Sequence, residues 1–300
     1  MEVYHRGTGQ LVNRDKSAVF FSANASDEMK QEFLETMEIG MEALAEKYLG
    51  LPTAVGRSTK DAFEYMPTRI KSLVGSWSGK EASCAGRKVL LKSKAQAIPT
   101  YPISCFLLPK STCKKKKTTI VNYWWGSSAD NQHMHWMRWD LLTQPKLCGG
   151  MGFKDLPMFN KAMLGKQGWR LLSNSDSLCA RVLKGRYYHD GDFLTATRKN
   201  HASQTWRAIL VGREALQEGL VKRIGDGLGT NIWETKWIHN HPTGRPFTPY
   251  DPRVTMIAYL LNNDQWDEDL IRDIFCDFDA EAILSTSING RGGDFWSWAQ

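Results

Sequence analysis

Carboxylate pairs are the first feature to look for, because neighbouring aspartates hold the two Mg²⁺ ions of nucleotidyl-transfer sites about 4 Å apart. The 300 residues contain no Asp-Asp dipeptide. Asp190 and Asp192 flank Gly191 in a short stretch that is more typical of a surface turn than of a metal site. We therefore predict no catalytic residue and no bound cofactor in this chain.

A zinc site is the second possibility, through His133, His135 and Cys148. Zinc modules usually supply ligands in C-x-x-C or similar pairs, whereas this chain has an H-x-H spacing without such a partner. Trp136 and Trp139 follow the histidines and favour a packed aromatic segment. The sequence thus predicts no metal site.

Basic side chains are concentrated in one part of the chain. Residues 57–117 carry 14 Lys/Arg against 3 Asp/Glu, whereas residues 251–300 carry 3 against 10. Basic surface of that density attracts phosphate backbones, although a solvated helical face would have the same composition.

The remaining composition is that of a soluble globular protein inside the cell, in the nucleus or cytoplasm. The six cysteines form no C-x-x-C pair, which fits a reducing compartment. No apolar run approaches the roughly 18 residues of a membrane span, so we expect no membrane partner. Residues 1–13 lack the apolar core of a signal peptide.

Hydrophobic periodicity predicts a mainly α chain with a small β remnant at the N-terminus (α+β). We expect a strand at 18–21, a helix over 26–38, and a strand or turn at 48–52. A further helix follows Ser58 and is bent by Pro67 in its middle. Other helices are expected over 86–97, within 156–188, over 206–221 and near 267–276.

Several phrases, in a fixed order, resemble the reverse transcriptases of plant non-LTR (LINE-type) retrotransposons. TGQLVNRDKSAVFFS (8–22) is similar to the segment after that family's catalytic Asp-Asp box, and KYLGLP (47–52) to its primer-grip hairpin. AGRKVLLKSKAQAIPTYPISCFLLPKSTC (85–113) resembles its thumb. HWMRWDLLTQPKLCGGMGFKDLPMFNKAMLGKQGWRLL (135–172), SLCARVLKGRYY (177–188) and RIGDGLGTNIWETKW (223–237) resemble the regions that follow. The chain is identified as a fragment of such an enzyme.

The resemblance implies a fold of palm, fingers and thumb, with two Mg²⁺ ions in the palm of the full-length enzyme. This chain is expected to begin after the Asp-Asp box and to be inactive alone as an RNA-directed DNA polymerase. Lys16 matches a lysine after the box, and Tyr48 and Gly50 match the primer grip. An ordinary strand-edge lysine and a plain hairpin are the alternatives at those positions.

The thumb segment holds the best candidates for contacts with a template–primer. Such a thumb touches phosphates without reading sequence. The candidate residues are Arg69, Lys71, Lys80, Arg87, Lys88 and Lys92. Trp124 and Trp125 beside the lysine run could stack on bases, but large aromatic side chains are more often core.

Five features depart from the family pattern in a direction that predicts lower stability. Pro67 is expected inside a helix, and Lys94 on the face of Leu90 and Leu91 would place an ammonium against the core. Gly165 replaces a helix-favouring Ala at a cost of about 1 kcal/mol. Lys114–Lys117 interrupt an apolar segment, and Lys222 replaces an aromatic residue. Such changes are typical of drift without selection.

These observations predict four segments. Residues 1–56 would be the end of a palm with the primer-grip-like hairpin, 57–125 a thumb-like basic helical domain, 126–240 a helical connection, and 241–300 an acidic linker toward a truncated zinc-binding module. We expect a truncated, inactive reverse transcriptase fragment that binds nucleic acid non-specifically. The alternative is a non-catalytic nucleic-acid-binding protein derived from a retroelement.

Overall fold

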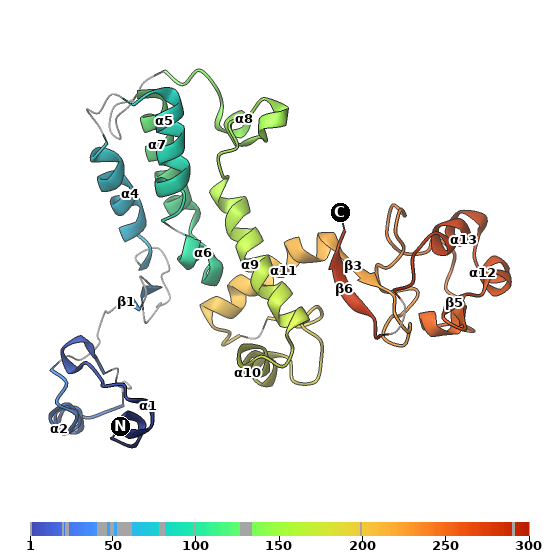
Figure 1. Cartoon of the computed structure of the whole chain (residues 1–300), viewed down its shortest axis with the longest axis horizontal. Helices are drawn as coiled ribbons and strands as arrows, with labels where there is room; N and C mark the ends of the chain where they lie inside the picture. Colours follow the sequence, from blue (N-terminus) through green and yellow to red (C-terminus); the bar gives the residue numbers. More distant parts are fainter. Residues whose placement is uncertain are drawn as a thin grey trace. The chain divides into compact units, whose positions relative to one another are not determined.

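The structure is a computed structural model that describes residues 2–19, 21, 24–40, 47–48, 51–52, 62–77, 82–98, 100–126, 134–198, 200–289 and 292–299. The chain divides into two compact units, Met1–Tyr65 and Met66–Gln300, which are described separately below. Helices dominate and the strands are short, as Figure 1 shows. The predicted fold class, mainly α with a little β, is confirmed.

The first unit contains short helices and one hairpin. Its helices are α1 (Glu2–Thr8), the 3₁₀ turn η1 (Arg14–Lys16) and α2 (Asp27–Met37). The side chain of Ser26 caps α2 by accepting a hydrogen bond from the Met29 N–H at 3.3 Å, which satisfies a free backbone donor of the first turn. Strands β1 (Lys47–Tyr48) and β2 (Leu51–Pro52) pair antiparallel, as predicted. The strand predicted at 18–21 is wrong at its described positions, where only Val19 takes part in a β-bridge.

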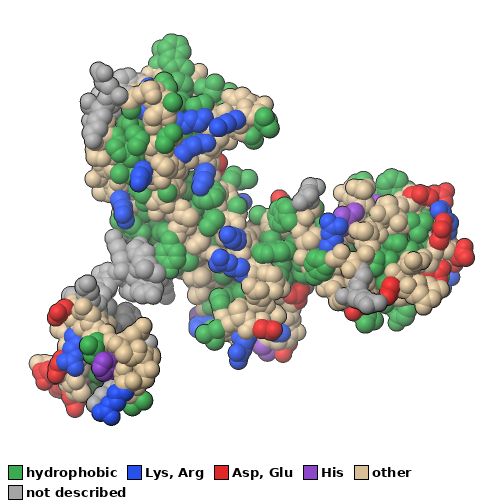
Figure 2. All heavy atoms as spheres, viewed as in Figure 1, with side chains coloured by type: hydrophobic (Ala, Val, Ile, Leu, Met, Phe, Trp, Pro, Cys, Tyr) green, Lys and Arg blue, Asp and Glu red, His purple; other side chains and the backbone are tan. Residues whose placement is uncertain are grey.

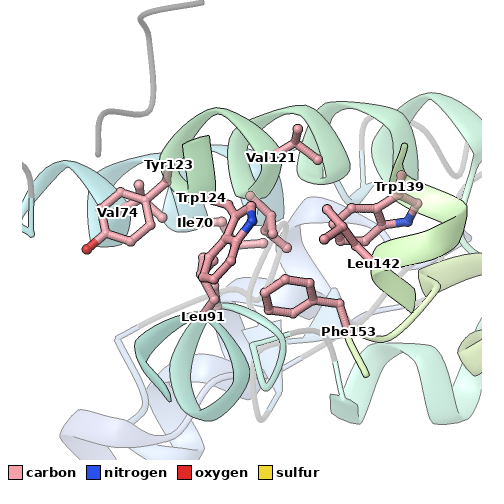
Figure 3. Close-up of a cluster of buried hydrophobic side chains, with 11 residues drawn as sticks. Ile70, Val74, Leu91, Val121, Tyr123, Trp124, Trp139, Leu142 and Phe153 are labelled. Carbon is pink, nitrogen blue, oxygen red and sulfur yellow. The ribbon is translucent and has the colours of Figure 1, made fainter. Parts of the chain in front are cut away.

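The second unit starts with helices around one apolar cluster (Figure 3). They are α4 (Tyr65–Gly75), α5 (Cys84–Leu90) with the π-helical turn η2 (Leu91–Ala95), α6 (Thr100–Cys105) and α7 (Lys110–Gly126). Buried side chains of α4, η2 and α7 meet residues from the segment that follows α7: Ile70, Val74, Leu91, Ala95, Ile120, Val121, Tyr123, Trp124, Trp139, Leu142 and Phe153.

Two expected disruptions in these helices are wrong. Pro67 is the third residue of α4, not its middle, and in the first turn its missing N–H has no intrahelical partner to lose. Lys94 is exposed rather than packed on the core. The π turn explains the difference: the Gln96 N–H donates to Leu91 O, five residues back, at 2.9 Å. The wider turn places Leu91, Ala95 and Gln96 inside and rotates Lys94 to solvent.

The next helices are α8 (Trp139–Thr143), the 3₁₀ turn η3 (Lys146–Cys148), α9 (Leu156–Ser173), α10 (Leu178–Tyr187) and α11 (Gln204–Gly219). Helices α9 and α11 cross where Gly165 meets Gly212. A Cβ at Gly212 would lie 2.4 Å from Gly165 N, and one at Gly165 would lie 3.2 Å from Gly212 O. Gly212 is therefore required by the close crossing, and a side chain at Gly165 would be in tight contact with the Gly212 carbonyl oxygen.

The last part of the chain carries further strands that the sequence did not predict, in addition to the hairpin of the first unit. Strand β3 (Leu220–Arg223) pairs antiparallel with β6 (Phe295–Trp298). Between them lie η4 (Ile257–Leu260), β4 (Leu261–Asn262), β5 (Gln265–Trp266), α12 (Glu268–Ile274) and α13 (Asp277–Leu284). Partners so far apart in the sequence leave no local signal.

Lys222 in β3 has a place in this fold. Its ammonium donates to Gly229 O at 3.1 Å and lies 5.0 Å from the ring centroid of Trp296. Asp294 closes the same loop, because its Oδ1 accepts from the N–H groups of Gly225 and Gly227 at 2.7 and 3.0 Å. The replacement of an aromatic residue by Lys222 is thus accommodated by specific contacts.

None of the helices that the structure describes is long and apolar enough to cross a membrane.

Candidate nucleic-acid interface

The predicted contact residues of the first unit lie in short elements. Lys16 ends η1 and Tyr48 ends β1 of the hairpin. Gly50, and Lys80 of the second unit, lie outside the described residues. The primer-grip assignment therefore stays a prediction.

Helix α4 presents Arg69 and Lys71 to solvent. Both side chains are exposed, while Met66, Ile70 and Val74 of the same helix are buried. The helix is thus amphipathic, with its apolar side chains in the core and these two cations at the surface.

Arg87 of α5 forms a hydrogen bond with the end of α7. Its Nη1 donates to Trp124 O in the last turn of α7 at 3.1 Å, and its Nη2 lies 3.4 Å from Cys84 Sγ. Trp124 O belongs to the carbonyl groups at the end of a helix that have no intrahelical partner, and a guanidinium stabilises them. A change at Arg87 would therefore disturb the α5–α7 contact as well as the surface charge.

Lys88 and Lys92 belong to a cluster of ammonium groups that also includes Lys146 and Lys154. The pKa of Lys92 is lowered by partial burial and then by the charges of Lys88, Lys146 and Lys154. Lys92 Nζ lies beside Gly152, where a Cβ would be 3.2 Å from it. We call these four lysines the basic face.

Lys146 and Lys154 were not among the predicted residues. They come from the connection after α7, and the packing of aromatic rings brings them to Lys88 and Lys92. Trp139 stacks on Phe153 at 5.8 Å between ring centroids, and Phe153 contacts Trp124 edge-on at 5.4 Å. Trp124 is thus a core residue, the interpretation that the sequence favoured over a stacking platform.

Figure 2 places this charge on the molecule: Lys and Arg side chains are spread over the part that carries α4 to α8, and Asp and Glu gather around α12 and α13. An even spread of like charge along helices and an adjoining loop is suited to phosphate contacts, which carry no sequence information.

The lysine run 114–117 lies within α7 and so does not interrupt its helix. Lys114 and Lys117 are exposed, but Lys116 is only 4% exposed. Burial, and to a smaller extent the charge of Lys154, lower the pKa of Lys116 to about 7. Lys116 lines a cavity of about 430 Å³ beside the start of α9.

The cavity is positioned by Asn160 of α9, which is buried. Its Oδ1 accepts from the Leu108 N–H at 2.8 Å, and its Nδ2 donates to Ile103 O and Phe106 O at 2.7 and 2.9 Å. These bonds fix the segment between α6 and α7 against α9. The start of α7 is therefore held at a set distance from α9.

A buried His–Asp pair in the last part of the chain has a structural explanation. His241 Nε2 lies 3.1 Å from Asp279 Oδ1, and Thr248 donates its N–H and hydroxyl to Asp279 Oδ2 at 2.7 and 2.6 Å. Thr243 Oγ1, beside His241 Nδ1, donates to Arg245 O at 2.7 Å. Nucleophilic catalysis would require the Thr243 hydroxyl to donate its proton to the imidazole, and here the hydroxyl donates to Arg245 O instead.

The residues considered as metal ligands do not come together among the described residues. His135 and Cys148 are exposed, and His133 lies outside the described residues. Asp190 and Asp192 are exposed in the turn after α10. Across the described part of the chain, no three His, Cys, Asp or Glu side chains are grouped so that they could hold a metal ion.

Comparison with known proteins identifies plant relatives, although no family model matches the chain. An uncharacterized mitochondrial protein of Arabidopsis thaliana is 38% identical over 143 residues, which are 47% of this chain and 93% of that protein. A putative ribonuclease H protein of the same plant is 32% identical over 222 residues, which are 72% of this chain and 35% of that protein. The chain thus spans about a third of the second relative.

These similarities define a family. Because the match covers nearly all of the mitochondrial protein, this chain belongs to the same family as that protein. The two relatives agree with the coarser part of the sequence prediction, a plant protein related to retrotransposons.

Proposed function

We propose that this chain is the thumb and following connection of a plant non-LTR retrotransposon reverse transcriptase, inactive as a polymerase, and that it binds nucleic acid without sequence preference. The observation that carries the binding proposal is the basic face, on which Lys88, Lys92, Lys146 and Lys154 converge from two separate segments. Arg69 and Lys71 on α4 would extend the contact, and the predicted segments at 1–56, 57–125, 126–240 and 241–300 would keep their places in such an enzyme.

Hydrolysis or polymerisation by this chain is not part of the proposal. Polymerisation in this family depends on two metal ions held by carboxylates of an Asp-Asp box, and the sequence contains no Asp-Asp pair. The full-length family enzyme is expected to use Mg²⁺. The role proposed for this chain is to hold a template–primer by its phosphates.

The second candidate is a separate, non-catalytic nucleic-acid-binding protein derived from a retroelement. It is favoured by the mitochondrial relative, 93% of which is covered by the shared segment. A protein that consists almost only of this segment has no room for a complete polymerase. The two candidates share the basic face and differ in whether the neighbouring DNA encodes an in-frame palm.

The binding experiment compares two triple variants that lose the same charge. The test variant is Lys88→Gln, Lys92→Gln and Lys146→Gln, and it leaves Arg87 and its bond to Trp124 intact. The control variant removes three exposed cations of α9 and α10: Lys166→Gln, Arg181→Gln and Lys184→Gln.

The measurement is fluorescence anisotropy with a labelled duplex at several salt concentrations. Engagement of a few phosphates predicts a slope of log K against log[salt] of about −3 to −6, with micromolar or weaker affinity at physiological salt. The test variant should reduce the slope for every sequence tried, and the control should not. Equal loss of binding in both variants would mean that net charge alone is responsible, and the basic face would have no special role.

A further inference from the structure

The cavity beside Lys116 has the composition of a ligand site. Its volume of about 430 Å³ lies within the range of small-molecule pockets, which are mostly apolar with a few convergent polar groups. Its wall combines an apolar part, contributed by Ile120, Trp139, Leu156, Pro157 and Phe159, with polar side chains from α7 and the segment before α9.

Positive charge surrounds this apolar wall. Lys116 is inside, and Lys110, Lys114, Lys117 and Lys154 are exposed around it. The titratable groups besides these lysines are the Cys113 thiol and the carboxylate of Asp155. Asp155 Oδ1 already accepts from the Met158 N–H at 3.1 Å, as the N-cap of α9. The cavity therefore has an excess of cations.

The side-chain amide of Gln96, in the wall of the cavity, has a donor group without an acceptor. Gln96 is 3% exposed and lines the cavity. Its Oε1 accepts from the Lys154 N–H at 3.3 Å, whereas its Nε2 is buried without a hydrogen-bond partner. A buried N–H group without a partner costs free energy, and an acceptor oxygen in the cavity would satisfy it.

Lys116 is a buried cation without a carboxylate among the groups that act on it. The groups that act on it electrostatically are Cys113 and Lys154, and neither supplies a carboxylate. A buried ammonium is stable only when a counter-charge and hydrogen bonds replace its hydration. Lys116 and Gln96 therefore both need what an anion with acceptor oxygens provides.

We infer that this cavity binds a small organic anion, in which a flat or apolar body carries a phosphate or carboxylate group. The body lies against Trp139, Leu156 and Phe159, and the anionic group lies at Lys116 and Gln96. The chemistry fits a free nucleoside monophosphate and also an unpaired nucleotide of a strand bound at the basic face. The inference does not require the proposed nucleic-acid binding.

Pyridoxal 5′-phosphate is a suitable probe, because it joins an aromatic ring, a phosphate and an aldehyde. At pH 7.5 the amine of Lys116 attacks the aldehyde carbon, water leaves, and an imine forms. Borohydride then delivers hydride to the imine carbon, and the resulting secondary amine marks the residue for peptide mass spectrometry. Labelling should concentrate on Lys116 over its exposed neighbours Lys114 and Lys117.

Benzaldehyde separates anion recognition from simple amine reactivity. The ratio of Lys116 labelling to Lys114 labelling should be at least tenfold higher with pyridoxal 5′-phosphate than with benzaldehyde, and uridine monophosphate should protect Lys116 from the phosphate probe. Protection by single-stranded oligo(dT) but not by the mononucleotide would assign the ligand to a nucleic-acid strand. An equal Lys116 to Lys114 ratio for the two aldehydes, or no protection by any anion, would overturn the inference.

Variants locate the effect without relying on the loss of Lys116. Lys115→Met, a change at an exposed neighbour that does not line the cavity, should leave labelling unchanged. Gln96→Leu should weaken protection by uridine monophosphate about tenfold, because one hydrogen bond to a charged group is lost, and should leave benzaldehyde labelling unchanged. The triple variant of the basic face should still be labelled at Lys116, so failure of the nucleic-acid proposal would not remove this result.

Discussion

Replacement of Lys116 by Met should stabilise the protein at neutral pH. Met has nearly the same length as Lys and no charge, so it can occupy the same place in α7 beside the apolar wall. Burial lowers the pKa of Lys116 from its ordinary value of 10.5 to about 7. The folded protein therefore binds this proton much less tightly than the unfolded chain does.

The size of the effect follows from that difference. Each pKa unit corresponds to about 1.4 kcal/mol, so the lowering from 10.5 to about 7 costs the folded state roughly 4 kcal/mol at pH 7. Structural relaxation and water around the ammonium reduce this value, and we expect Lys116→Met to raise the free energy of unfolding by about 2–4 kcal/mol. Between pH 7 and 10.5 the unfolded chain holds more protons, so the stability of the unchanged protein rises with pH.

Urea unfolding followed by tryptophan fluorescence at pH 7, 8.5 and 10 measures this effect. The advantage of Lys116→Met should be largest at pH 7 and should shrink steadily toward pH 10. Lys115→Met, an exposed neighbour, is the matched control and should change stability by no more than about 0.5 kcal/mol at any of these pH values. A destabilised Lys116→Met variant, or an advantage that does not depend on pH, would refute the reasoning.

Three further predictions concern the crossing of α9 and α11, the His241–Asp279 pair and the chemistry. Gly212→Ala places a Cβ 2.4 Å from Gly165 N and should lower the free energy of unfolding, measured by thermal melting, by about 3 kcal/mol. The control Gly185→Ala has open space around its Cβ and should be neutral or stabilising in the same measurement. Burial alone would raise the pKa of Asp279, but hydrogen bonds from Thr248 and nearby groups lower it below the ordinary value of 3.8. These hydrogen bonds therefore stabilise the folded protein above pH 3.8, and the stabilisation is lost as the pH falls through the lowered pKa of Asp279. The variant Asp279→Asn should accordingly flatten the acid limb of an unfolding titration. Purified residues 1–300 should not extend a primer on an RNA template with Mg²⁺, and extension above a blank would contradict the proposed inactivity.

The helices with clear apolar periodicity were predictable from sequence. Helix α2 begins at Asp27, directly after its N-cap Ser26, as the cap pattern indicates, and the helical segments near 86–97, 156–188 and 206–221 are present. Helix α7 was missed because four consecutive lysines hide the buried face that Lys116 and Ile120 share. The β3–β6 pair was missed because pairing between distant segments is set by tertiary packing and not by local preference.

Only those residues of the basic face that lie in the Lys- and Arg-rich stretch of the sequence could be predicted. The excess of Lys and Arg in 57–117 singled out Lys88 and Lys92, but Lys146 and Lys154 join them through the stacking of Trp139 on Phe153, which composition does not encode. Departures from the family pattern were also misjudged for a physical reason. Gly165, Lys94 and Lys222 look unfavourable by helix propensity or hydrophobicity alone, and each is accommodated by a contact or a turn that only the fold provides.

The most direct test of the central claim is the difference in salt slope between the two triple variants on one labelled duplex. If Lys88, Lys92 and Lys146 contact phosphates, their removal should make the slope less negative by about 2–3, since each neutralised phosphate contributes about 0.9. The control, Lys166→Gln with Arg181→Gln and Lys184→Gln, should keep the slope of the unchanged protein. A slope near zero for the unchanged protein, or one that the basic-face variant leaves intact, would contradict nucleic-acid binding by this surface.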